Sequence, residues 1–200
     1  MQIHRSAERE RATIIDAAYR CLVDAGDRPI RMSAILACAG LSSRAFYRHF
    51  SSKDDLLLAL VTHKYEQLAA RLDGIAEKAV GGPVDQLTAW IEAAFDATLD
   101  PQHRMHLAVL DSDEVRAAKG YGEARQRWYT ERERSLIQIL SRGQFDGSLP
   151  LADPETDAMA ISALVSRIIA AQKADDTDSA AYARSRATEF VLRAVGAADR

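Results

Sequence analysis

The sequence predicts an all-α protein. Apolar residues recur with a 3.6-residue period in almost every segment, the five prolines fall where helices would begin or end, and no run alternates polar and apolar residues as a half-buried strand does. With 200 residues, the chain is long enough for one large domain or two small ones and for a substantial core.

The N-terminal quarter predicts three helices. The first covers residues 6–25, with Gly26 as its C-terminal cap, and its apolar stripe consists of Ile14, Ala18, Cys21, Leu22 and Ala25. A short helix follows at 32–39. Gly40 can then adopt a positive φ in a tight turn, and Ser42 caps a third helix at 43–50.

The rest of the chain predicts longer helices. One begins at Lys53, after the cap Ser52, and runs to about Val80, where Gly81-Gly82-Pro83 stops it. The further helices are expected at 84–99, 102–111, 115–143, 154–172 and 179–197, with a connecting loop at 143–150.

Charge is divided unevenly along the chain. The formal net charge is −3, but the part through Lys53 carries +4 and the remainder −7. A basic end on an acidic body indicates that the N-terminal quarter faces a polyanion.

Composition indicates a soluble cytoplasmic protein. No apolar run approaches the roughly 18–20 residues that a membrane span needs, and the charged N-terminus lacks the features of a secretory signal. Cys21 and Cys38 are expected to be reduced thiols on apolar helix faces, serving as small core residues rather than as a redox switch.

The segment 43–50 is amphipathic when it is projected on a helix. Phe46 and Phe50 point inward, Arg44 and Arg48 lie nearly opposite, and donor-bearing side chains flank the inward face. A short helix, a glycine turn and a second short helix with a donor-rich outer face have the form of a DNA-binding helix-turn-helix. The alternative is a charged, solvated face of a small helical bundle, but turn chemistry, amphipathic geometry and charge asymmetry together favour DNA binding.

Residues 11–56 resemble the N-terminal domain of the tetracycline-repressor (TetR) family of transcriptional regulators. The resemblance is carried by Ile14-Ile15-Asp16-Ala17-Ala18, Gly26, Ile35, Ala39-Gly40-Leu41-Ser42, Phe46-Tyr47-Arg48-His49-Phe50 and Ser52-Lys53-Asp54-Asp55-Leu56. It implies a DNA-binding domain at 1–52 and a helical ligand-binding and dimerisation domain at 53–200. The implied function is a ligand-responsive repressor that acts on a double-stranded DNA operator.

The resemblance also implies roles for individual residues. Ser42, Tyr47, His49 and Lys53 are expected to contact phosphate. Base reading is expected from Ser43, Arg44, Ala45 and Arg48, and Arg44 is the best candidate for a bidentate contact to guanine.

Arg31 departs from the family pattern. Related proteins usually have Thr or Ser here, which caps the second helix and touches phosphate, whereas Arg31 supplies no such cap but can still reach phosphate. A helix start capped by Ser33 is an alternative.

A recognition helix this short calls for a homodimer that reads the two half-sites of a palindromic operator. The last two helices carry suitable stripes, namely Met159, Ala160, Ala163, Leu164 and Ile168, then Ala183, Ala187, Phe190, Val191, Ala194 and Val195. By pattern alone these stripes fit an intrachain core equally well, and the resemblance favours the dimer interface.

The resemblance further implies a small-molecule pocket among the central helices. Candidate lining residues are Tyr65, Trp90, Phe95, Met105, His106, Tyr121 and Trp128, although any single one fits an ordinary core position as well. The sequence does not identify the ligand.

Metal and enzyme chemistry find little support. His103 and His106 are three residues apart and could share a helical face as metal ligands. No Cys or acid cluster joins them at a suitable spacing, so neither metal nor cofactor is predicted. No nucleophile–base–acid arrangement or phosphate loop is present, and an all-α enzyme is the weakest hypothesis. The main alternative to a regulator is a helical dimer that binds ligands or proteins without sequence-specific DNA binding.

Overall fold

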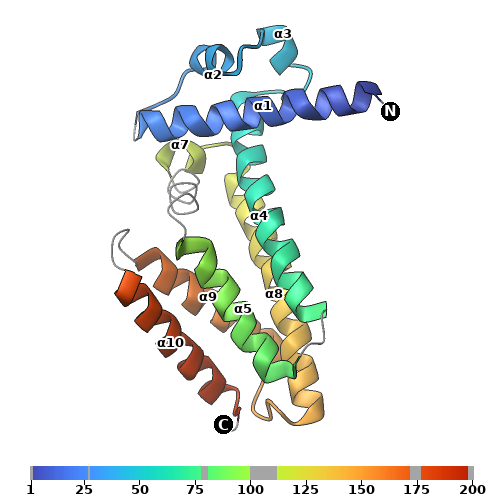
Figure 1. Ribbon diagram of the computed structural model, residues 1–200, viewed down its shortest axis with the longest axis vertical. Coiled ribbons are helices and arrows are strands. Elements are labelled where there is room, and N and C mark those ends of the chain that lie inside the picture. The colour runs from blue at the N-terminus through green and yellow to red at the C-terminus, as the bar shows by residue number, and fades with distance from the viewer. Residues whose placement is uncertain (1, 27, 78–80, 100–111, 172–176, 198–200) are drawn as a thin grey trace. The chain divides into compact units, whose positions relative to one another are not determined.

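The computed structural model describes residues 2–26, 28–77, 81–99, 112–171 and 177–197 (Figure 1). Every regular element in those ranges is a helix, which confirms the all-α prediction. The helices are α1 (Gln2–Ala25), α2 (Met32–Ala39), α3 (Ser43–Phe46), α4 (Lys53–Glu77), α5 (Pro83–Leu99), α7 (Asp113–Arg116), α8 (Tyr121–Asp146), α9 (Pro154–Ala171) and α10 (Thr177–Ala194).

Most of the predicted helices are found close to their expected bounds. The short helix α2 has the predicted ends, and α3 begins at Ser43 as expected but is one turn long, ending at Phe46 rather than Phe50. The predicted helix at 102–111 lies outside the described residues.

The predicted single helix at 115–143 is wrong at both ends. Gly120 adopts a φ of +94° and separates α7 from α8, because a left-handed residue cannot continue a right-handed helix. At the other end α8 continues past Gly143, which was expected to open a loop. The side chain of Leu149 packs so closely on Gly143 that an added Cβ would lie 2.4 Å from it.

Contacts divide the chain into two units. The first comprises Met1–Tyr65 with Met105–Gln126, and the second comprises Glu66–Arg104 with Arg127–Arg200. Helices α4 and α8 supply residues to both units. The boundary predicted at residue 52 concerns function rather than packing and stays a prediction.

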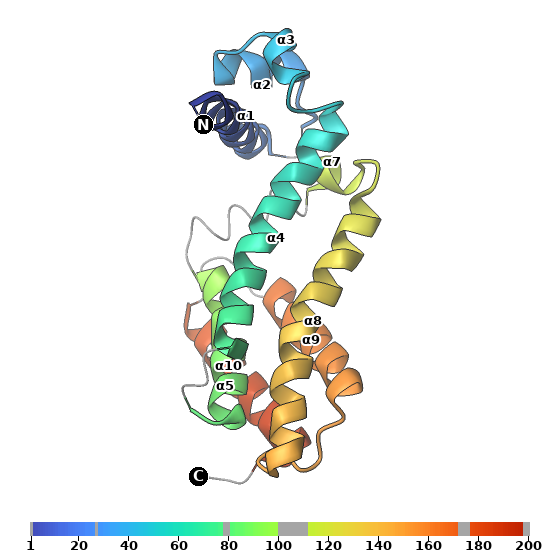
Figure 2. The ribbon, with the colours of Figure 1, turned by 90° about the vertical axis from the view of Figure 1, so that its right-hand side faces the viewer.

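In the first unit, α1 passes beneath α2 and α3 (Figure 2). The side chains at its centre are fully buried: Ile14 from α1, Ile35 from α2, Phe46 from α3, and Leu56 and Leu60 from α4. Burial of large apolar side chains, each contributing roughly 1.5–3 kcal/mol, fixes these helices against one another.

The two cysteines differ in their surroundings. Cys21 is partly buried against the first core, and the pKa of its thiol is raised by burial and by the neighbouring Cys38 thiol. Cys38 is exposed on α2, so the expectation that it fills the core is wrong.

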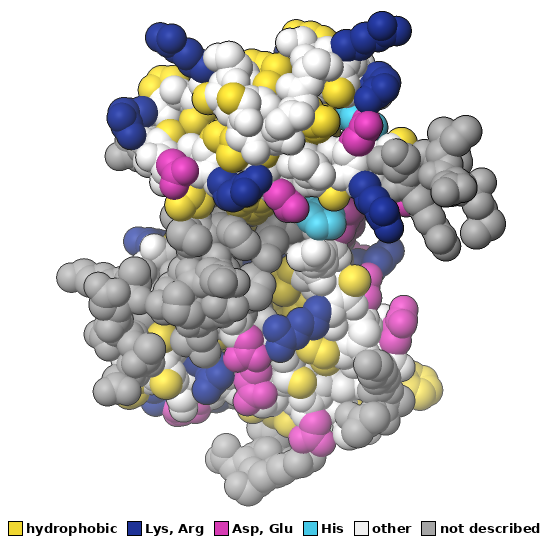
Figure 3. Space-filling view, turned by 45° about the horizontal axis from the view of Figure 1, so that its top comes forward, with side chains coloured by type: hydrophobic (Ala, Val, Ile, Leu, Met, Phe, Trp, Pro, Cys, Tyr) yellow, Lys and Arg dark blue, Asp and Glu magenta, His cyan; other side chains and the backbone are white. Residues whose placement is uncertain are grey.

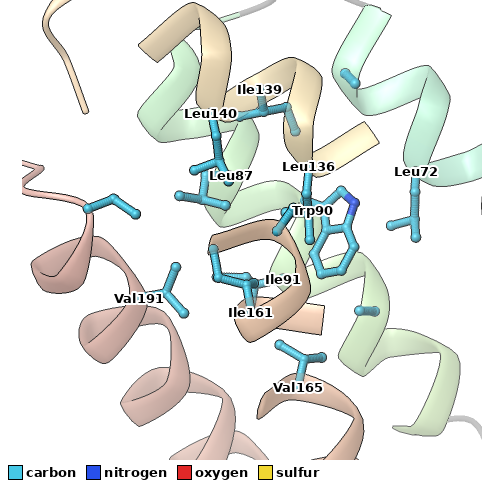
Figure 4. Close-up of a cluster of buried hydrophobic side chains, with 14 of the residues drawn as sticks. Leu72, Leu87, Trp90, Ile91, Leu136, Ile139, Leu140, Ile161, Val165 and Val191 are labelled. Atoms are coloured by element: carbon cyan, nitrogen blue, oxygen red, sulfur yellow. The ribbon is translucent and has the colours of Figure 1, made fainter. Parts of the chain in front are cut away.

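The second unit has its own core, in which Trp90 of α5 is surrounded by aliphatic side chains (Figure 4). Helices α5, α9 and α10 contact one another there. Ala187, Val191 and Val195, which were predicted to face a dimer partner, belong to this core and are almost fully buried. Residue spacing alone did not distinguish these core positions of α10 from candidate interface positions.

None of the helices in the described ranges is both long enough and apolar enough to cross a membrane.

Candidate nucleic-acid interface

The turn between α2 and α3 is built on Gly40. Its φ of +65° ends α2, its N–H donates to Ala37 O at 3.2 Å, and Leu41 N donates to Leu36 O at 3.1 Å. These bonds satisfy the last carbonyls of α2 and reverse the chain. The predicted positive φ is confirmed.

Ser42 caps α3 as predicted. Its backbone is extended, and its Oγ accepts a hydrogen bond from Ala45 N at 3.2 Å. Such a cap contributes about 1 kcal/mol, a large share for a helix of one turn.

The two faces of α3 are distinct. Phe46 and Phe50 are buried, with ring centroids 5.5 Å apart, whereas Ser43 and Arg44 are exposed. Ala45 is 7% exposed and packs inward, so its predicted place on the base-reading face is not observed.

Tyr47 projects from the end of α3. It is 65% exposed, and its ring stands edge-on to Phe46 with centroids 5.2 Å apart. The buried ring of Phe46 therefore packs against the exposed ring of Tyr47 and helps to fix its position.

Arg48 and His49 are held by Glu10 of α1. Arg48 Nη2 lies 2.7 Å and His49 Nε2 lies 3.0 Å from the same Glu10 Oε2. The His49 hydrogen bond, followed by the charge of Arg48, holds the pKa of Glu10 below its ordinary value. Because α3 ends at Phe46, Arg48 does not stay on the outer face with Arg44 as projected.

Lys53 is engaged at the start of α4. Its Nζ donates to Ile30 O at 2.5 Å and pairs with Glu114 of α7. A phosphate would therefore have to compete with Glu114 for this ammonium group. Sequence reasoning missed Glu10 and Glu114, because acids 38 and 61 residues away from their partners leave no local pattern.

Arg31 precedes α2 as its N-cap and makes no side-chain cap bond, as predicted for an arginine at this position. Ser33 lies inside α2, so the alternative start capped by Ser33 is wrong. The Arg31 side chain is exposed.

Around the turn, the first unit exposes Arg31, Ser42, Ser43, Arg44 and Tyr47. Basic side chains stand at separate points of this face rather than in one continuous patch (Figure 3). Arg44 has no ion pair or hydrogen bond to any described residue, so its guanidinium is available to a ligand. Exposed donors at the start of a short helix suit contacts to phosphates and base edges.

The described candidates for the ligand pocket belong to different units. Tyr65 and Tyr121 contribute to the first core, and Trp90 and Phe95 are buried in the second. Trp128 lies in the second unit, and Met105 and His106 lie outside the described residues. What the structure does bring together is Trp90 and Trp128, on a shared arginine.

A groove of about 500 Å³ lies elsewhere in the second unit, between α4 and α5. Its lining mixes small or apolar residues with the polar side chains of Arg71, Asp85, Gln86, Glu92 and Asp96, none of which was predicted. Within the described part of the chain, no three His, Cys, Asp or Glu side chains are grouped to hold a metal ion.

A tight glycine turn between two short helices, packed on α1 and followed by a separate helical unit, defines a helix-turn-helix protein of all-α class. Residues 14–60 match the family model for "Bacterial regulatory proteins, tetR family". The match spans the helix-turn-helix and the parts of α1 and α4 that pack with it, and it confirms the resemblance to this family seen in the sequence.

Curated relatives share the N-terminal part most clearly. The HTH-type transcriptional regulator BetI of Rhizobium meliloti is 34% identical over 88 residues, covering 44% of this chain and 42% of BetI. The HTH-type transcriptional repressor KstR2 of Mycolicibacterium smegmatis is 26% identical over 143 residues, covering 69% of this chain and 66% of KstR2. The chain thus spans less than two thirds of the length of either relative.

The fold as a whole has solved counterparts. The transcriptional regulator FadR from Bacillus subtilis, in complex with stearoyl-CoA, aligns with a TM-score of 0.75 at 20% identity. The alignment covers 92% of this chain and 98% of FadR, which establishes the common fold of both units.

Proposed function

We propose that this protein is a cytoplasmic, ligand-responsive transcriptional repressor that binds a palindromic DNA operator as a homodimer. The observation that carries the proposal is the α2–turn–α3 surface, where Ser43, Arg44 and Tyr47 face outward over buried Phe46. The similarity to BetI and KstR2, an HTH-type transcriptional regulator and an HTH-type transcriptional repressor, supports it. Regulators of this kind bind rather than convert their ligands, so no enzymatic activity is proposed.

Base reading is assigned to Ser43 and Arg44, and phosphate contacts to Arg31, Ser42 and Tyr47. Arg48, His49 and Lys53 are proposed to contact phosphate or bases after they exchange a carboxylate partner for the DNA. The exchange is favourable near DNA because a phosphate backbone presents several negative charges, whereas Glu10 and Glu114 present one each.

The dimer is proposed to form through α9 and α10. Met159, Tyr182 and Phe190 are each more than half exposed, and Ala160, Ala163 and Ala194 expose small side chains on the same two helices. Large apolar side chains left in water beside small ones suit close packing against a second copy.

An effector is proposed to bind the second unit, and the solved complex of FadR with stearoyl-CoA shows that a regulator of similar fold binds a small molecule. Binding that favours one conformer of the second unit would change the spacing of the two DNA-binding heads and lower operator affinity.

DNA binding is tested by fluorescence anisotropy at physiological salt, with fragments from upstream of the protein's own gene and with random DNA. We expect the upstream fragment to bind at least about 1000-fold more tightly. Arg44→Ala should weaken the specific complex, whereas Arg127→Ala, an exposed arginine in the second unit, should not. Equal affinity for both DNAs would overturn the proposal in favour of a helical binding module without sequence-specific DNA recognition.

The interface is tested by sedimentation velocity. Phe190→Glu should shift the dimer toward monomer, because it places a charge in an apolar contact. Phe145→Glu, at an even more exposed phenylalanine near the end of α8, is the matched control and should leave the dimer intact. Dissociation by the control alone would move the interface to that end of the second unit.

A further inference from the structure

Arg132 of α8 is a buried cation without a carboxylate partner. Arg132 is 3% exposed, and among the described residues no acidic side chain forms an ion pair with it. Burial lowers the pKa of its guanidinium to about 10, so the group stays charged at neutral pH. Charges buried in proteins are ordinarily paired, which makes this arginine unusual.

The other arginines of the second unit show the ordinary arrangement. Arg71 and Arg184 pair with Asp96, and Arg134 pairs with Asp73, all of them at more exposed positions. Arg142 is partly buried and also forms no ion pair with a described acidic side chain. Its Nε donates one hydrogen bond and its Nη2 donates two, in each case to a carbonyl oxygen. Arg132 alone among these five combines near-complete burial with an unused donor.

The hydrogen bonds of Arg132 are incomplete. Nη1 donates to Ser166 Oγ at 2.9 Å and Nη2 donates to Ser162 O at 3.1 Å, both on α9. The buried Nε has no partner, and neither does the buried Oγ of Ser162. Two hydrogen-bonding groups thus remain unsatisfied on residues that contact each other, and a bound anion or a water molecule could satisfy both.

Two indoles flank the same guanidinium. Its Cζ lies 5.0 Å from the ring centroid of Trp90 and 5.2 Å from that of Trp128. The rings stabilise the cation electrostatically but accept no hydrogen bond from Nε. They also supply flat apolar surface next to the charge.

We propose that Arg132 is the anion-binding residue of an effector site in the second unit, with Ser162 as a second donor. The ligand class is an anionic amphiphile, with a carboxylate or phosphate monoester head on Arg132 and an apolar body against Trp90 or Trp128. Arginine presents a planar set of donors that matches such heads, and a low-dielectric setting strengthens the pairing. The inference rests on the proposed function, in which the second unit binds an effector.

The chain carries its own probe for this site, because Trp90 and Trp128 are its two tryptophans. Tryptophan emission is recorded while the full-length protein is titrated with octanoate, octyl phosphate or 1-octanol at constant ionic strength. We expect a saturable change with at least one of the two anions and at least about tenfold weaker binding of 1-octanol, the loss expected for one charge-assisted hydrogen bond. Which anion binds more tightly distinguishes carboxylate from phosphate ligands.

Arg132→Met separates a binding role from a packing role. In a binding site, the variant should lose octanoate or octyl phosphate affinity at least about tenfold, while its thermal midpoint stays unchanged or rises, because an unpaired buried charge has been removed. Arg142→Met is the matched control and should leave anion binding unchanged. If Arg132→Met does not fold, Ser162→Ala replaces it and should weaken anion binding with little change in thermal midpoint, since the Ser162 hydroxyl has no partner to lose.

Three results would overturn the inference: 1-octanol binding as tightly as the anions, no saturable response to either anion, or full anion affinity in Arg132→Met or in the Ser162→Ala variant that replaces it. A buried water on Nε would give the second result. Operator binding is measured on the same preparation without amphiphile. If operator binding is intact and the anion response is absent, the Arg132 site fails and the proposed function stands.

Discussion

The two units hold one set of candidate binding cations each, and they hold them in opposite ways. In the first, Arg48 and His49 share Glu10, and Lys53 pairs with Glu114 near the surface. In the second, Arg132 is buried between two indoles with no carboxylate. A surface pair can exchange its carboxylate for a phosphate at little cost, because water screens both states. A buried cation has no such screening, so its environment selects for one kind of ligand.

The largest expected difference between the units concerns their cores. Phe46→Ala should cost about 3–5 kcal/mol and Leu136→Ala about 2–5 kcal/mol, since both side chains are fully buried, one in each unit. Urea unfolding is followed by far-ultraviolet circular dichroism and by tryptophan fluorescence, which reports on the second unit.

Phe46→Ala is expected to separate these two signals, with helix loss preceding the fluorescence change. Leu136→Ala should lower the fluorescence midpoint itself. Coincident transitions in the Phe46→Ala variant would show that the two contact-defined units unfold together, as the shared helices α4 and α8 would then enforce.

The next effect compares two arginines within the first unit. Arg44→Ala should reduce specific operator affinity by about 1–3 kcal/mol, because Arg44 is exposed and has no partner to leave. Arg48→Ala should cost less, since wild-type Arg48 must first release Glu10. Both are measured by anisotropy at two salt concentrations. A larger loss with Arg48→Ala would assign it the main base contact.

Local chemistry made the helix-turn-helix predictable. Gly40 predicts the turn after α2, and Ser42 predicts the N-terminal cap of α3. The spacing of Phe46 and Phe50 predicts which face of this segment is buried. The family pattern in the same stretch gave the class of protein. These signals are short-range, so a single sequence contains them in full.

Long-range partners were beyond the same reasoning. Nothing near Arg48 indicates that Glu10 will hold it, and nothing near Lys53 indicates Glu114. Trp90 and Trp128 were predicted as pocket residues, but Arg132 between them was missed, because a charged residue on a helix is ordinarily solvated. Packing of α8 against α5 and α9 decides its burial.

Glycine substitutions give a smaller effect with opposite signs in the two units. Gly40→Ala meets no steric contact but must hold a φ of +65°, which costs about 1–2 kcal/mol. Gly74→Ala, inside α4 and equally open, should stabilise the second unit by about 0.5–1 kcal/mol. Thermal midpoints measure both. Destabilisation by Gly74→Ala would show that the groove between α4 and α5, which Gly74 lines, does not accommodate a side chain at this position.

The smallest effect tests the Glu10 contact through its pH dependence. The pKa of folded Glu10 lies below the ordinary 4.5, chiefly because His49 hydrogen-bonds its carboxylate. A lowered folded-state pKa contributes stability above the unfolded-state pKa, and that contribution disappears as pH falls through the folded value. Wild type should therefore exceed Glu10→Gln in urea midpoint at pH 7, and the gap should close below about pH 4. Glu8→Gln, at an exposed position on α1, is the control and should show no such gap. A gap that persists unchanged at low pH would mean that Glu10 acts by packing rather than by charge, and the surface-exchange description of the first unit would then fail at this site.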